Sequence, residues 1–306
     1  MAGCWLLVTS HFPISTVSQT SSSLPTDFFT SPTRVAWRRF RRHKLALVSV
    51  VVLVLMGLAA LFAPMLTPYG MDDQDLFNQN APPSSEHWLG TDELGRDVLG
   101  RLLYGGRVSL SVGLFAAVIS TTIGVAVGAV AGYFGGAIDN VLMRLVDLLL
   151  AFPAIFLLLI LFATIRPNVT TVIIYLGIFG WLYLARIVRG EFLSLREKDF
   201  VVASRALGAG APRLIWRHLL PNVAGAIIVT TTLEIAFNLL AEGTLSFLGF
   251  GVPPEVPTWG NMLTSASSTY LTAPLLTIVP GVTLTVAVLA VNFIGDALRD
   301  ALDPHG

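Results

Sequence analysis

The sequence is poor in charge and almost free of cysteine. Only 12% of its 306 residues are Asp, Glu, Lys or Arg, whereas a soluble domain averages about 25%. The single cysteine, Cys4, excludes an intrachain disulfide and any metal site built from several cysteines. The five histidines show no H-E-x-x-H or similar ligand spacing, and there is no G-x-x-x-x-G-K-[ST] loop to cradle phosphates. The sequence therefore predicts no catalytic residues, no metal site and no nucleotide site in this chain.

Long apolar runs take the place of charge. Hydrophobic residues make up 54% of the chain and the mean hydropathy is +0.73. A helix that spans a bilayer needs roughly 20 apolar residues. Helices are favoured over open strands because every backbone group in lipid needs an internal partner. The sequence predicts an all-α integral membrane protein with about six transmembrane helices, at residues 45–66, 108–133, 141–165 (which contains Pro153), 170–187, 223–248 and 274–298.

The basic residues gather in two clusters, and these predict the orientation of the chain. One cluster precedes the first run and the other lies between the fourth and fifth runs. Four spans separate them, so they share one side, which is the cytoplasm by the positive-inside rule. Both termini then lie in the cytoplasm. The net charge of zero indicates no nucleic-acid partner. The clusters consist of Arg34, Arg38, Arg39, Arg41, Arg42 and Lys44, and of Arg186, Arg189, Arg196, Lys198, Arg205, Arg213 and Arg217.

The same runs divide the chain into parts. Residues 1–33 are rich in Ser and Thr and predict a disordered tail. A basic segment with the first span covers residues 34–66, and an extracytoplasmic loop rich in Asp and Glu covers residues 67–107. The transmembrane core is expected over residues 108–298, with a cytoplasmic loop at 189–222, and a short tail over 299–306.

Two helices carry recognisable faces. Gly113, Ala117, Gly124, Gly128 and Gly132 recur about every four residues in the second span, which predicts a seam for close helix packing. In the fifth span three polar residues fall on one stripe, and acids inside a bilayer face water or a partner. Pore lining and hydrogen bonding between helices both remain open for this stripe, which consists of Glu234, Asn238 and Glu242.

A further acid, Asp147, lies inside the third span. It is a possible lining residue of a translocation path. Arg144 lies one turn away and offers an ion-pair partner instead.

The segment of residues 189–222 is too long for a simple turn. Residues 200–207 predict a short helix that ends at Gly208 and Gly210, and Pro212 suits the first turn of a second helix over residues 213–219. Pro221 is expected to end that helix at the membrane surface. An apolar ridge outside the membrane indicates a docking surface, or else a helix lying on lipid headgroups. The ridge predicted for the second helix consists of Leu214, Ile215, His218 and Leu219.

This segment resembles the cytoplasmic "EAA" loop of ABC importer permeases, whose pattern is E-A-A, three residues, G, nine residues and I-x-L-P. By position, the residues that match the pattern are Ala203, Gly208, Leu220 and Pro221. Val202 stands where glutamate is usual, Ser204 replaces the second alanine and His218 replaces the isoleucine.

Other segments resemble the dipeptide and oligopeptide branch of that family. They are residues 37–44 (WRRFRRHK), 87–97 (HWLGTDELGRD), 245–251 (LSFLGFG), 257–261 (PTWGN) and 296–300 (DALRD). The resemblance runs from Arg34 to Pro304 and implies a type I importer fold in a bacterial or archaeal cytoplasmic membrane. It also implies that separate ABC ATPase subunits bind ATP, that a second permease subunit completes the pore, and that an extracytoplasmic binding protein delivers peptides or a related solute.

In such a permease the two cytoplasmic helices couple to the ATPase. The residues expected to make this coupling contact are Val202, Ala203, Ser204, Gly208, Leu214, Ile215, His218, Leu220 and Pro221. The outer loops at residues 71–97 and 249–272 are candidates for docking of the binding protein. The cargo stays open among dipeptides, oligopeptides, nickel complexes, glycosides and opines.

Two other functions are weighed. A secondary transporter or channel would use intramembrane acids, for which Asp147, Glu234 and Glu242 are available, but no internal repeat is visible. An intramembrane enzyme would need paired groups within the bilayer, yet no histidine lies in a predicted span and there is no G-x-S-x-G elbow.

Overall fold

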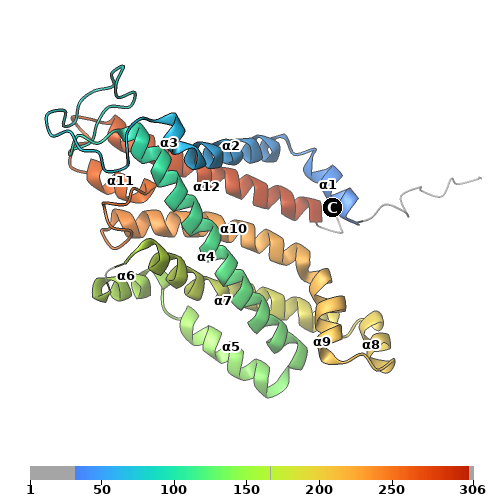
Figure 1. The fold of residues 1–306 in the computed structure, drawn as a ribbon. Coiled ribbons are helices and arrows are strands. Elements are labelled where there is room, and N and C mark those ends of the chain that lie inside the picture. The colour runs from blue at the N-terminus through green and yellow to red at the C-terminus, as the bar shows by residue number, and fades with distance from the viewer. Residues whose placement is uncertain (1–31, 166, 303–306) are drawn as a thin grey trace, which may run out of the picture.

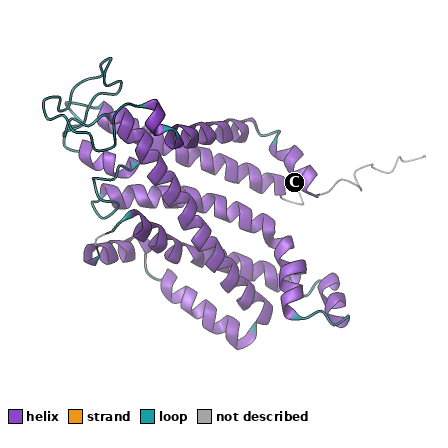
Figure 2. Cartoon of the chain, viewed as in Figure 1, coloured by secondary structure: helices purple, strands orange, loops and turns teal. Residues whose placement is uncertain are grey.

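The computed structural model describes residues 32–165 and 167–302. The predicted tail of residues 1–33 therefore lies almost entirely outside the described residues, as do residues 303–306. Within the described ranges the chain is helical, apart from loops and one isolated bridge between Thr91 and Asp97 (Figures 1 and 2). The prediction of an all-α protein is confirmed.

Five helical segments among the described residues are long and apolar enough to cross a membrane. They are α2 (Lys44–Leu61), α4 (Val98–Phe134), α7 (Val169–Leu195), the continuous run Ala211–Phe247 that ends in α10 (Leu220–Phe247), and α12 (Leu275–Leu302). A sixth crossing requires two helices, α5 (Gly136–Leu150) and α6 (Ala154–Thr164), which meet at an angle of 75°.

Pro153 explains this bend. Proline has no backbone N–H and cannot continue the hydrogen-bond ladder of α5. The last turn of α5 closes where the amide of Ala151 donates to the carbonyl oxygen of Asp147 at 3.0 Å, and Pro153 then precedes α6 with extended backbone. The third run is thus two helices rather than the single span predicted for residues 141–165.

The packing of α4 on α7 shows that the bent pair acts as one crossing. Gly124 of α4 lies against Leu184 of α7, and farther along both helices Gly132 lies against Phe192. Residue numbers at these contacts increase in the same direction along both helices, so α4 and α7 run parallel. Two parallel spans start at the same face of the bundle, so the chain between them must cross back through α5 and α6.

The predicted glycine seam is confirmed as a close-packed face.

The remaining spans run antiparallel to their neighbours. Gly113 of α4 faces Leu239 of α10, whereas Thr121 of α4 lies 2.8 Å from the hydroxyl of Thr231. Helix α12 packs along α10 and along α2. Figure 1 shows α2, α12 and α10 as neighbouring rods that α4 crosses obliquely, with α7 and then α5 below α10.

Several helix ends differ from the sequence prediction because local caps decide them. Helix α4 starts at Val98 rather than Val108, since Asp97 caps it by accepting from the amide of Gly100 at 2.6 Å. The outer loop therefore ends at Asp97. Helix α2 ends at Leu61 and the short helix α3 (Ala63–Leu66) follows. Helix α12 continues to Leu302, so the tail predicted for residues 299–306 is helical as far as it is described.

Candidate functional site

The segment between α7 and α10 forms two short helices joined by a tight turn. Helix α8 (Asp199–Ala206) is followed by α9 (Ala211–Arg213) and the wider helical turn η2 (Leu214–Leu219). Gly208 adopts φ +87°, a left-handed conformation that side chains disfavour. The amide of Gly208 donates to the carbonyl oxygen of Arg205 at 3.0 Å, which closes the end of α8. The predicted helix–turn–helix is confirmed, and it is called the coupling element below (residues 199–219) after the role expected for it.

Pro221 does not end the second helix as the sequence predicted. The chain passes without a break from η2 into α10, and Pro221 occupies the first turn of that helix. In η2 the amide of Leu220 donates to the carbonyl oxygen of Ile215, five residues back. This wider turn accommodates the ring of Pro221 and its missing donor. The second helix of the coupling element is thus rigidly continuous with a membrane span.

One face of the coupling element is buried in the bundle. Val201 of α8 and Leu214 and Leu219 of η2 are completely buried, and they pack with Phe192 of α7 and Val223 of α10. This burial corrects the predicted docking ridge, because Leu214 and Leu219 belong to the core of the chain. Helical spacing could not tell which apolar residues face the chain's own helices.

The opposite face of the coupling element exposes large apolar side chains. Leu207 is 89% exposed and Trp216 is 72% exposed. Val202, Ala203 and Phe200 are also exposed. Large apolar side chains in such a cluster mark an interaction surface rather than a packing face. Arg205, Arg213 and Arg217 are also exposed on the coupling element, while Ser204, Ile215, His218 and Leu220 are half-buried. Sequence reasoning missed Leu207 and Trp216, although Leu207 precedes Gly208 and Trp216 lies two residues before His218 in the recognised pattern.

The polar stripe of α10 faces α4. Glu242 is completely buried and accepts from the hydroxyl of Ser246 at 2.7 Å and from that of Ser109, on α4, at 3.2 Å. Glu234 accepts from the hydroxyl of Ser120, also on α4. These bonds favour the interhelical alternative for both acids. Between them Asn238 is 1% exposed, and neither side-chain polar atom has a hydrogen-bond partner among the described residues.

Asp147 is placed differently from the other acids. Its carboxylate accepts from the guanidinium of Arg186 on α7, not from Arg144, and both partners remain about half exposed. A second ion pair between the same helices joins Arg189 to Asp139, with nitrogen–oxygen distances of 2.5 and 2.6 Å. These two pairs tie α5 to α7 at the end of the bundle that carries the coupling element.

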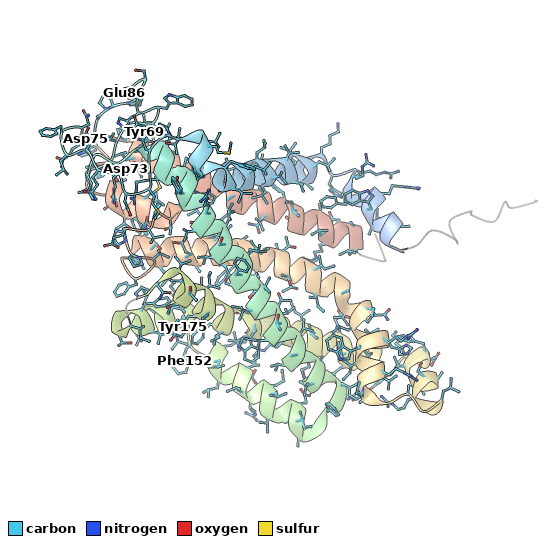
Figure 3. The ribbon with its side chains drawn as sticks, viewed as in Figure 1. Tyr69, Asp73, Asp75, Glu86, Phe152 and Tyr175 are labelled. Atoms are coloured by element: carbon cyan, nitrogen blue, oxygen red, sulfur yellow. The ribbon has the colours of Figure 1, made fainter. Side chains whose placement is uncertain are left out.

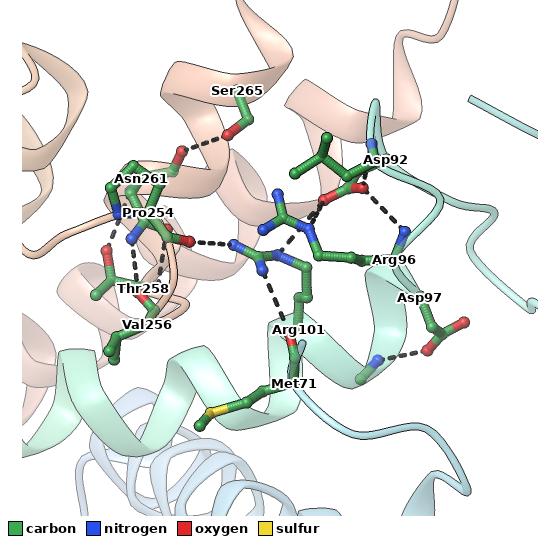
Figure 4. A network of polar contacts seen from close by, with 12 residues as sticks. Met71, Asp92, Arg96, Asp97, Arg101, Pro254, Val256, Thr258, Asn261 and Ser265 are labelled. Atoms are coloured by element: carbon green, nitrogen blue, oxygen red, sulfur yellow. Dashed lines mark hydrogen bonds and ion pairs between the residues drawn. The ribbon is translucent and has the colours of Figure 1, made fainter. Parts of the chain in front are cut away.

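At the opposite end of the bundle an arginine network holds the outer segments together (Figure 4). Arg96 donates to Asp92 at 2.7 Å within the loop of residues 67–97. Arg101, on the first turn of α4, lies 3.6 Å from the same carboxylate and donates to the carbonyl oxygens of Met71 at 3.4 Å and Pro254 at 3.1 Å. The loop before α4 and the segment after α10 therefore form one unit, called the outer platform (residues 67–97 and 249–258) after the side of the membrane expected for it.

Helix α11 (Trp259–Ala266) connects this platform to the buried acid. A capping box between Thr258 and Asn261 starts the helix. The amide of Trp259 donates to the hydroxyl of Ser109 at 3.2 Å, and that hydroxyl donates to Glu242. Sequence reasoning identified the PTWGN motif but not its contact with α4 and α10, which only the folded chain brings together.

The platform also carries a cleft of about 630 Å³ that opens to the surface. Its lining includes three carboxylates and one arginine, Arg96, which is already paired with Asp92. Acidic and aromatic residues stand out on the same end of the molecule, where Figure 3 labels Tyr69, Asp73, Asp75 and Glu86. The cleft is lined by Asp72, Gln74, Glu93, Leu94, Arg96, Pro254, Glu255, Thr264, Ser265 and Ser268.

Two family models match the chain. The model described as "Binding-protein-dependent transport system inner membrane component" matches residues 124–305, and "N-terminal TM domain of oligopeptide transport permease C" matches residues 31–83. The first match contains the coupling element, and the second contains α1 (Pro32–Phe40) and α2.

Similar proteins match over most of their length. The oligopeptide transport system permease protein OppC of Bacillus subtilis is 40% identical over 88% of this chain and 88% of its own. The dipeptide transport system permease protein DppC of the same organism is 42% identical over 90% of this chain and 86% of its own. The glutathione transport system permease protein GsiD of Pectobacterium atrosepticum is 38% identical over 90% and 91%.

Among solved structures, inward-facing conformations of the MetNI methionine ABC transporter share the fold. One such chain aligns with a TM-score of 0.54 at 20% identity, over 65% of this chain and 94% of its own length. The recognised loop, the ordered motifs and the family matches agree. The chain belongs to the family of binding-protein-dependent transport system inner membrane components and is a multi-pass inner-membrane permease.

Proposed function

We propose that this chain is one of two permease subunits that enclose a path for peptides, and that ATP hydrolysis in separate subunits drives the transport. The cargo is inferred from the relatives, whose names specify oligopeptides, dipeptides and glutathione. The chain itself binds no nucleotide in this proposal. Both termini and the coupling element then lie in the cytoplasm, as the basic residues predict.

The observation that carries the proposal is that the coupling element has one face buried in the bundle and one apolar face exposed. Its inner face is sealed into the bundle by Val201, Leu214 and Leu219, while its outer face presents Leu207 and Trp216 to solvent. A partner bound to the exposed face of this element can move the spans only if the buried face is fixed to them. The continuous backbone from η2 into α10 supplies that fixed connection.

The coupling surface in this proposal comprises the exposed face of α8, the turn at Gly208 and the exposed face of η2. An ATPase partner that closes on nucleotide pushes this surface, and α10 moves with it. Two arrangements of the spans biased by nucleotide suffice for alternating access. The proposed contact residues are Val202, Ala203, Ser204, Leu207, Gly208, Trp216 and His218, with Leu220 and Pro221 at the junction to α10.

At the opposite face an extracytoplasmic binding protein docks on the outer platform. The fixed geometry supports this role, because Arg101 joins the loop of residues 67–97 to the segment of residues 249–258 in one rigid surface. A second permease subunit covers the other exposed apolar faces, since one set of about six spans encloses no pore of its own.

Single-cysteine cross-linking tests the coupling contact directly. The only native cysteine is Cys4, so Cys4→Ser gives a cysteine-free background. In inverted membrane vesicles with the ATPase subunits present, Ala203→Cys and Trp216→Cys are expected to cross-link to an ATPase subunit. Leu214→Cys is the matched control, because Leu214 lies in the same element but is completely buried. Equal capture from all three positions, or capture from none, contradicts the proposed surface.

A transport measurement tests the energy source. Peptide uptake by cells that carry the complete transporter is expected to stop when ATP is depleted and to continue when an uncoupler removes the proton gradient. The opposite pattern favours a secondary transporter that uses Asp147, Glu234 or Glu242.

A further inference from the structure

Helix α1 and the turn that follows it carry a dense patch of positive charge. Arg38, Arg41, Arg42 and Lys44 are all exposed, and none forms an ion pair within the part of the chain that the structure describes. The sequence from residue 28 to residue 71 contains no Asp or Glu at all. Among the described residues, Asp300 lies 3.8 Å from the imidazole of His43, and it forms no ion pair with Arg38, Arg41, Arg42 or Lys44.

The patch is held at the boundary of the bundle and is not a loose tail. Phe40 is 7% exposed and packs with Ala46 of α2 and with Ala297 and Ala301 of α12. Figure 1 shows α1 beside the start of α2 and the end of α12. Helix α2 is a membrane span that begins at Lys44, immediately after the turn of residues 41–43. Connectivity therefore places the four cations at the surface of the membrane.

An exposed tryptophan near the patch is further support for a contact with lipid. Trp37 is 61% exposed and stacks on Phe40, with ring centroids 6.0 Å apart. Tryptophan is enriched at membrane–water interfaces, where its ring sits at headgroup level. A short helix with one side packed on the protein, an exposed Trp37 and several arginines fits the interfacial class of amphipathic helices.

We propose that α1 and its turn bind anionic phospholipid headgroups of the adjoining leaflet, through Arg38, Arg41, Arg42 and Lys44. Guanidinium groups bind phosphate oxygens in a forked geometry, which suits a phosphodiester headgroup. A protein partner is less favoured, because the patch is joined within one short turn to a span and lies where headgroups must be. The site orients α2 and the end of α12 against the bilayer, and it does not depend on the cargo.

Lipid retention by the purified full-length chain provides the test. The chain in detergent is mixed with equal amounts of phosphatidylglycerol and phosphatidylcholine, and retained lipids are counted by native mass spectrometry. Preferential retention of phosphatidylglycerol is expected. Each basic residue near an anionic surface contributes about fivefold to binding. The triple variant Arg38→Gln/Arg41→Gln/Arg42→Gln is therefore expected to reduce retention by at least about fivefold.

A matched variant removes the same number of charges at the same end of the bundle. Arg205, Arg213 and Arg217 are exposed on the coupling element. Their replacement by Gln is expected to leave phosphatidylglycerol retention within twofold of the unmodified chain. Equal losses in the two triple variants overturn the proposal, because they indicate general charge attraction. An excess of inorganic phosphate that abolishes retention indicates a free-phosphate site and overturns the lipid assignment.

Fluorescence quenching of Trp37 gives a second measurement that needs no charge variant. The chain is reconstituted with either phosphatidylglycerol or phosphatidylcholine brominated near the headgroup end of the acyl chain. The Trp37 signal is obtained by subtracting the spectrum of Trp37→Phe. Stronger quenching by the anionic lipid supports the proposal, and equal quenching by the two lipids overturns it even if the triple variant fails to insert.

Discussion

The guanidinium of Arg101 donates to the carbonyl oxygen of Pro254 at 3.1 Å and so joins the first turn of α4 to a segment 153 residues farther along the chain. The same side chain lies 3.6 Å from the carboxylate of Asp92 and is only 2% exposed. One buried side chain thus fixes the two parts of the outer platform relative to each other.

Replacement of Arg101 is expected to loosen the platform. Arg101→Met leaves the oxygen of Pro254 without its donor, and removal of one partner from a buried charged network costs about 3–5 kcal/mol. The loss is expected at the lower end of that range, because Arg96 still neutralises Asp92. Thermal unfolding in detergent measures the loss, and faster proteolysis at residues 249–258 reports the loosened segment.

Arg144 supplies the control for this change because it is exposed. Arg144→Met is expected to alter stability by no more than about 0.5 kcal/mol. Arg101→Lys is expected to restore only part of the loss, since an ammonium group lacks the planar fork that reaches several oxygens. Full stability in Arg101→Met would show that the platform is held by other contacts.

The turn of the coupling element is expected to depend on Gly208. An added Cβ would meet no atom within 4 Å, so any effect of Gly208→Ala comes from its φ of +87° alone. That conformation costs a non-glycine residue about 1–2 kcal/mol. Peptide uptake is expected to fall severalfold at an unchanged membrane level of the protein. Gly190→Ala is the control, since Gly190 has the same open surroundings but lies inside helix α7 at an ordinary φ.

The two faces of the coupling element are expected to respond to truncation in opposite ways. Trp216→Ala removes an exposed ring, so it should leave stability unchanged while it lowers uptake and the stimulation of ATP hydrolysis by cargo. Leu214→Ala opens a cavity at a completely buried site and should cost about 2–5 kcal/mol of stability. If Trp216→Ala transports normally, the exposed ring is not part of the contact with the motor.

Glu242 is expected to serve as a structural hydrogen-bond acceptor. Its carboxyl group is buried, and its two oxygens accept from Ser109 and Ser246 respectively. The amide of Gln keeps one acceptor oxygen, and its NH2 group can donate to the hydroxyl oxygen of the other serine. Glu242→Gln is therefore expected to retain uptake within about twofold, whereas Glu242→Ala removes the acceptor of both hydroxyl protons, at a cost of about 1–3 kcal/mol each. Loss of uptake in Glu242→Gln at a normal protein level would indicate a role in the path.

Hydropathy was sufficient to predict the membrane class and the approximate spans, because the requirement for about 20 apolar residues is a local property. It was not sufficient for the helix ends. Asp97 starts α4 well before the apolar run, and Pro153 divides the third run into α5 and α6. Both outcomes follow from single residues whose effect depends on the backbone around them.

The candidate site was likewise predictable only in part from the sequence. The order of glycines and prolines predicted the two short helices between α7 and α10, since Gly208 and Pro212 act on their immediate neighbours. The direction of each apolar side chain was not predictable. Leu214 is buried and Leu207 is exposed because of the position of α7 and α10, which sequence spacing alone does not give. The contact from Trp259 to Ser109 joins residues 150 positions apart and left no local signal.

The seam between α4 and α7 offers the sharpest packing test. A Cβ added at Gly128 would lie 2.6 Å from the carbonyl oxygen of Ala185 and 2.8 Å from the Cβ of Val188. Backbone and Cβ atoms cannot rotate away, so the helices must separate, and overpacking of this kind costs about 1–3 kcal/mol. Gly128→Ala is expected to lower the unfolding temperature and to weaken the Arg189–Asp139 pair at the nearby end of α7.

Gly57 of α2 is the matched control, because an added Cβ there meets nothing within 4 Å. Gly57→Ala is expected to leave stability unchanged or to raise it by up to about 1 kcal/mol through helix propensity. If the two variants unfold at the same temperature, α4 and α7 tolerate a wider separation than the structure shows. The close contact of α4 and α7 at Gly128 would then not contribute to the stability of the bundle.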